Sequence, residues 1–133
     1  MSTVIVNTLT GTTTAGSISV TGEGNSTTTN LQQGLCKQWV LLQSSGNSVT
    51  DSFNNTSVTD NNTGDYTLTR TNNMANATYC AIGSSGDPQT SHNASSDVDV
   101  QTTSVHDIRC VNDDATSTQD IPDTVGSVLG EVA

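Results

Sequence analysis

The amino-acid sequence predicts an all-β protein, an antiparallel β-sandwich of jelly-roll-like type that follows an extended N-terminal arm. Three observations carry this prediction. Short runs of alternating apolar and polar residues recur along the chain, clusters of turn-forming residues separate them, and no segment sustains a helical period. The abundant Thr residues favour half-buried strands, whereas the abundant Ser and Asn residues favour turns. A chain of 133 residues has the length of a single domain with a core of its own.

Residues 1–30 are expected to form the extended arm, and residues 31–133 the sandwich domain. The arm has a short β-prone start and a later alternating pattern with little to bury, separated by runs of Thr, Ser, Gly and Asn. Such a segment becomes ordered by adding strands to a neighbouring subunit, because main-chain hydrogen bonds tolerate almost any side chain. The candidate assembly residues of the arm are Val4, Ile5, Val6, Leu9, Ile18 and Val20.

The sandwich domain is expected to begin with a short helix or turn near residues 31–35 and to continue as strands. The expected strands are 36–42, 48–53, a strand ending at 58, 66–70, 78–82, 98–105, 108–110 and 125–132. Polar connections separate them, and the two longest are a loop over 83–96 and an acidic, turn-rich segment over 112–123.

The clearest local signal is a hairpin within residues 51–68. Val58 closes one strand, residues 60–65 (DNNTGD) form the turn, and Tyr66 and Leu68 alternate with Thr in the next strand. Gly64 lies near the end of this turn, where it can adopt positive φ. The chain has few large apolar side chains, so its aromatic rings are assigned to the core rather than to a carbohydrate platform. The predicted core residues are Trp39, Val40, Leu42, Phe53, Val58, Tyr66, Leu68, Tyr79 and Ile82.

The net charge of −10 excludes two classes of function. Binding of nucleic acids or anionic membranes needs Lys and Arg side chains to neutralise phosphates. Lys37, Arg70 and Arg109 are the only bases and cannot form a basic face. The N-terminus has no basic segment and no long apolar run, so no signal peptide is expected, and no run approaches the roughly 18 apolar residues of a membrane span.

No pattern in the sequence predicts catalysis, a cofactor or a firm metal site. His92 and His106 lie neither in a nucleophile elbow nor in a zinc-binding spacing. Asp97 and Asp99 share one strand face and are either a pair of calcium ligands or solubilising acids on a solvent-facing strand.

The three cysteines, at positions 36, 80 and 110, are odd in number and far apart. Because free Cys is among the most buried residue types, we expect three reduced, buried thiols. A disulfide between Cys80 and Cys110 is the alternative.

Three stretches resemble a recurrent module of marine phage virion proteins, especially those of cyanophages: GLCKQWV (34–40), DSFNNTSVTDNNTGDYTL (51–68) and MANATYCAIG (74–83). The arm at 6–20 is similar to the N-terminal part of such proteins. They are usually described as tail fibre or virion structural proteins and are not known as enzymes. The resemblance implies a non-enzymatic protein on the surface of the tail or capsid, assembled in the host cytoplasm. It implies contacts with other virion proteins and a homo-oligomer, with a trimer as the expected state.

The chain departs from this module after Trp39, where an apolar run replaces a polar and aromatic Gly-rich strand, and residues 84–133 match it only loosely. Fibre proteins also tend to be longer, with shaft and tip regions. The resemblance, despite these departures, makes a tail fibre or appendage subunit that assembles through its arm the expected function. A capsid decoration protein and a host-receptor or carbohydrate-binding module are the alternatives.

Overall fold

The computed structural model describes residues 3–12, 18–21, 28–43, 48–86, 95–112 and 116–130, with the backbone alone at 32–33 and 95–100. The chain divides into two compact units, Met1–Leu35 and Cys36–Ala133. This division falls a few residues beyond the expected boundary between residues 30 and 31.

The first unit contains a small two-stranded sheet and one helical turn. Strand β1 (Ser19–Thr21) pairs antiparallel with β2 (Thr28–Asn30), and α1 (Leu31–Gly34) follows directly. The amide of Leu31 donates a 2.8 Å hydrogen bond to the carbonyl of Ile18, which joins the start of α1 to the start of β1. The arm is thus strand-like in part, as the alternation of Ile18 and Val20 with polar residues predicts.

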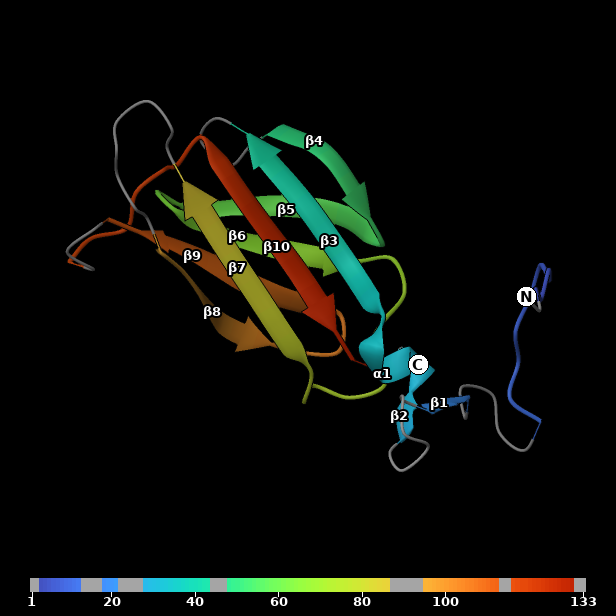
Figure 1. The fold of residues 1–133 in the computed structure, drawn as a ribbon. Coiled ribbons are helices and arrows are strands. Elements are labelled where there is room, and N and C mark those ends of the chain that lie inside the picture. Colours follow the sequence, from blue (N-terminus) through green and yellow to red (C-terminus); the bar gives the residue numbers. More distant parts are fainter. Residues whose placement is uncertain are drawn as a thin grey trace. The chain divides into compact units, whose positions relative to one another are not determined.

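The second unit consists of two four-stranded antiparallel sheets, which confirms the all-β prediction (Figure 1). The first, here called the β3 sheet, has the order β4-β3-β10-β7, and the second, the β6 sheet, has the order β5-β6-β9-β8. The bounds are β3 Cys36–Gln43, β4 Ser48–Phe53, β5 Asn55–Asn62, β6 Asp65–Arg70, β7 Cys80–Gly86, β8 Ser95–Gln101, β9 Val105–Val111 and β10 Asp123–Leu129. Hairpins β3–β4, β5–β6 and β8–β9 each stay within one sheet, and this order does not confirm a jelly-roll connectivity.

The β5–β6 hairpin is tighter than the sequence indicates. Strand β5 continues to Asn62 and β6 begins at Asp65, so two residues connect them instead of six. Gly64 adopts φ = 67° in this connection. A Cβ atom at Gly64 would come within 2.6 Å of the carbonyl oxygen of Gln119, so both the backbone conformation and the close approach of the Gln119 and Cys110 backbones require glycine here.

Several other element boundaries differ from expectation, and the run expected as one strand from 98 to 105 is divided between β8, which ends at Gln101, and β9, which begins at Val105. The segment expected as a loop from residue 83 continues β7 as far as Gly86, and β8 already begins at Ser95. The small residues of β7 pair with β10 through backbone hydrogen bonds, which do not depend on apolar side chains. The last strand ends at Leu129 and occupies a central position in the β3 sheet, between β3 and β7.

The core lies between the inward faces of the two sheets. Of the predicted core residues, four are fully buried: Val40, Leu42, Tyr66 and Leu68. The core also contains Cys110, whose burial was expected, and buried apolar residues that were not predicted, among them Met74, Ile108, Ile121 and Val128. Gly126 lets the sheets approach closely, because a Cβ atom there would collide with Ile108 and crowd Leu68.

The core prediction is wrong for three residues, Phe53, Ile82 and Trp39. Phe53 is 53% exposed and Ile82 is 49% exposed. Phe53 is the register partner of Trp39, whose neighbours Gln38 and Val40 are the buried side chains of β3, so Phe53 and Trp39 face away from the core. Trp39, Val58 and Tyr79 are partly buried. Alternation along a strand separates its two faces but does not show which of them is covered.

Candidate assembly site

Five of the six candidate assembly residues of the arm are exposed, and four of these lie near its start. The exposed fraction is 81% for Val4, 90% for Ile5, 57% for Val6 and 59% for Leu9. Residues 3–12 belong to no helix or strand. Residues 1–22 carry no charged side chain, so all 16 charged residues of this acidic chain follow the arm's first part. A contiguous apolar, uncharged segment of this kind is typical of a binding segment.

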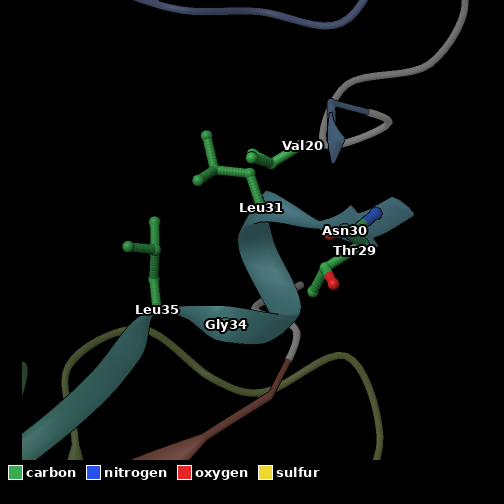
Figure 2. A pocket seen from close by; sticks show the side chains of 6 residues that line it. All are labelled: Val20, Thr29, Asn30, Leu31, Gly34 and Leu35. Atoms are coloured by element: carbon green, nitrogen blue, oxygen red, sulfur yellow. The ribbon is translucent and has the colours of Figure 1, made fainter. Parts of the chain in front are cut away.

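The remaining two candidate residues lie at the small sheet of the first unit. Ile18 is half-buried, whereas Val20 is 49% exposed. Val20 lines a shallow, mainly apolar hollow of about 240 Å³ with Leu31, Leu35 and residues 29–30 and 34. Figure 2 shows the side chains of Leu31 and Leu35 on the same side of α1, with Val20 reaching toward Leu31. This hollow has the size to accept one or two apolar side chains.

A second apolar surface lies on the outward side of the β3 sheet. We call it the outward apolar face and define it by Trp39, Leu41, Phe53, Ile82 and Val125, of which the last three are 43–53% exposed. Trp39 lies opposite Phe53 on one side and Ser127 on the other, Ser127 lies opposite Ile82, and Leu41 lies opposite Val125. This surface was not among the expected binding surfaces. The continuous apolar run of residues 39–42 is the signal for it, because such a run indicates a strand with two apolar faces.

Arg70 and His106 form a buried polar pair inside the sandwich. A guanidinium nitrogen of Arg70 lies 3.0 Å from Nδ1 of His106, and since Arg can only donate, Nδ1 accepts. Burial, and secondarily the positive charge of Arg70, lower the pKa of His106 to about 4, so this imidazole is neutral near pH 7. Arg70 also donates to the carbonyls of Thr102 and Thr103 and lies 4.5 Å from the ring centre of Tyr79. The pair therefore fixes the connection between β8 and β9.

Asp120 anchors the segment before β10 to the β5–β6 hairpin. One of its carboxylate oxygens accepts hydrogen bonds from the Gly64 amide and the Tyr66 hydroxyl, both at 2.7 Å. Burial, the hydrogen bond with Asp120 and the charge of that carboxylate raise the pKa of Tyr66. Asp120 and Tyr66 therefore hold the segment before β10 against the β6 sheet.

Asp97 and Asp99 lie on β8, where the structure describes the backbone alone, and His92 lies outside the described residues. Among the side chains that are described, no three His, Cys, Asp or Glu residues gather as a metal site.

The expectation of three buried thiols is wrong for two of them. All three cysteines are free, but Cys36 and Cys80 are exposed and only Cys110 is buried. The alternative, a disulfide between Cys80 and Cys110, is not formed. Burial raises the pKa of the Cys110 thiol, which keeps it protonated in the core.

The comparisons with known proteins give no relative for this chain: no protein-family model, no curated protein and no solved structure matches it. Over the residues that the structure describes, no helix has the length and apolar character needed to cross a membrane.

Proposed function

We propose that this protein is a non-enzymatic structural protein of a phage virion, a surface component such as a tail fibre or appendage subunit. It assembles through its N-terminal arm into a homo-oligomer, with a trimer as the expected state, and contacts other virion proteins. The observation that carries the proposal is the exposed run of Val4, Ile5, Val6 and Leu9 in a compact unit distinct from the sandwich. The resemblance of the hairpin at 51–68 to marine phage virion proteins supplies the virion context.

Energetics support an assembly role for the arm. Exposed apolar surface is unfavourable in water by about 25 cal/mol per Å², and its burial against a partner recovers this free energy. Residues 3–12 belong to no strand, so their backbone can add to a sheet edge of another subunit. The two polar clusters of the sandwich, at Arg70–His106 and at Asp120, both stabilise loops, which suits a rigid structural module.

Deletion of residues 1–30 tests the proposal. The truncated chain should keep the sandwich folded, because the core lies in the second unit, but it should fail to enter virus particles. Particle incorporation is measured by mass spectrometry of purified virions, and thermal unfolding of the purified truncated chain is the folding control. A folded truncated chain that enters particles at the normal level would show that the arm does not drive assembly.

Two alternatives place the same module in other roles. For a capsid decoration protein, electron microscopy of virions labelled at the C-terminus would show label over the head lattice instead of the tail.

A carbohydrate- or receptor-binding module is favoured by one observation: Phe53, the only Phe of the chain, is exposed beside Trp39, the only Trp. A glycan array probed with the intact chain and with Phe53→Ala tests it, and no binding to host-derived glycans would count heavily against it.

A further inference from the structure

The exposed large apolar side chains of the described residues fall into two groups. One group lies in the first unit and consists of Val4, Ile5, Val6, Leu9, Val20 and Leu35. The other lies in the β3 sheet of the sandwich: Phe53, Ile82 and Val125 are on its outward face, whereas Val49 on β4 is the register partner of the inward-facing Leu42. The described side chains of the β6 sheet contribute none. The chain therefore presents one apolar segment and one apolar sheet face, both open to solvent.

The dimensions of the segment and the face agree. An extended segment from Val4 to Leu9 spans roughly 17 Å, at about 3.3 Å per residue. Four strands spaced about 4.8 Å apart make a face about 14 Å wide. The row Phe53–Trp39–Ser127–Ile82 crosses all four strands of the β3 sheet, and Leu41 and Val125 lie in the adjacent row. One extended apolar segment laid along these rows would contact every residue of the outward apolar face.

The charge distribution identifies which part of a second copy can approach this face. Positions 23–133 contain all 13 acidic and 3 basic residues, so the remainder of the chain carries the whole net charge of −10. Two such bodies repel each other at separations below a Debye length of about 8 Å at physiological ionic strength. Residues 1–22 carry no charged side chain and add no such repulsion. The arm is thus the part of a neighbouring copy that can cover the face without bringing two acidic bodies into direct contact.

We propose that the outward apolar face of one copy is the acceptor for residues 4–9 of a second copy. This inference rests on the proposed function and names the surface that receives the arm. Around the two rings the face has the apolar side chains of Leu41, Ile82 and Val125, while Asp51, the register partner of Leu41, lies at its edge on β4. Repeated around a ring, the same contact closes a homo-oligomer in which every arm and every face is used.

Mixing of two full-length variants tests the proposal. Ile5→Asp disables the arm and leaves the face intact, whereas Ile82→Asp disables the face and leaves the arm intact. Both positions are at least 49% exposed, so both chains should fold. Thr59→Asp, at an exposed position of β5 in the other sheet, is the matched control for an added charge. Sedimentation velocity gives the masses, and circular dichroism during heating verifies folding.

The expected results are specific. The unaltered chain and Thr59→Asp form the oligomer, and each of the other two variants alone stays monomeric. An equal mixture of Ile5→Asp and Ile82→Asp forms a species of two chains and no larger one, because it contains one functional arm and one functional face per pair. Val125→Asp, also at an exposed position of the face, replaces Ile82→Asp in the same mixture if the latter does not fold.

Other outcomes overturn the proposal in distinguishable ways. If both face variants associate like the unaltered chain while Ile5→Asp is monomeric, the arm drives assembly but another surface accepts it. If each single variant is monomeric and the mixture is monomeric too, the arm of one copy does not bind the face of another. If Ile5→Asp also associates normally, the proposed assembly role of the arm is lost together with its acceptor.

Discussion

His106 is fully buried on β9, and Arg70 donates a hydrogen bond to its Nδ1 atom. A protonated imidazole could not accept the hydrogen bond from Arg70 at Nδ1, and its positive charge would lie beside that of the guanidinium group. The ring therefore stays neutral. The sequence alone did not suggest this pair, because the two residues are 36 positions apart and meet only when β6 pairs with β9. The same holds for Asp120 and Tyr66, which are 54 positions apart.

The buried neutral His106 predicts a loss of stability in mild acid. Its pKa is about 4 in the folded protein and about 6.5 in the unfolded chain, so the unfolded chain gains a proton first as the pH falls. The contribution is complete above about pH 6.5 and disappears progressively toward about pH 4, a loss on the order of 3 kcal/mol. Urea unfolding at pH 7 and pH 4.5 measures it.

His106→Gln is the control for this pH dependence. The variant retains a polar, neutral side chain of similar size but cannot titrate, so its stability should decline less between the two pH values. The remaining decline reports the other titrating groups. An equal decline in both chains would show that His106 does not contribute.

At the scale of elements, the sequence predicts most strands because alternation and turn residues are local signals. The hairpin at 51–68 and the strand over 36–42 follow directly from them. The extension of β7 to Gly86 does not, because residues 83–86 are small or polar and pair with β10 only through their backbone. The sequence also assigned Phe53 and Ile82 to the wrong face of their strands, because the buried face of a strand is the one that packs against the other sheet, and a local pattern does not identify it.

A close contact between the two sheets at Gly126 predicts the effect of a single added methyl group. A Cβ atom at Gly126 of β10 would collide with Ile108 of β9, so Gly126→Ala should lower the free energy of unfolding by about 1–3 kcal/mol through overpacking. Gly86→Ala, at the end of β7, is the matched control, because a Cβ atom there meets nothing within 4 Å. Urea unfolding of both variants measures the difference. Equal stabilities would show that the sheets are farther apart at Gly126 than the structure indicates.

At the scale of the whole molecule, the chain places scarce apolar side chains where a monomer gains nothing from them. Phe53, the only Phe of the chain, lies with Ile82 and Val125 on the outward face of the β3 sheet. The N-terminal Val and Ile residues are exposed in the first unit. Composition alone indicates the arm, since an apolar, uncharged stretch in an acidic chain is visible in the sequence. The apolar run at 39–42 indicates a second apolar face, but which residues of the other strands join it depends on the register of three strand pairs.

The central claim is that the arm joins copies of this chain, and the mass of the protein in solution tests it most directly. Sedimentation velocity of the unaltered chain over a wide concentration range should give an oligomer, with a trimer as the expected state, and Ile5→Asp should give a monomer at the same concentrations. A monomer for the unaltered chain at every concentration, or an oligomer unaffected by Ile5→Asp, would contradict the account.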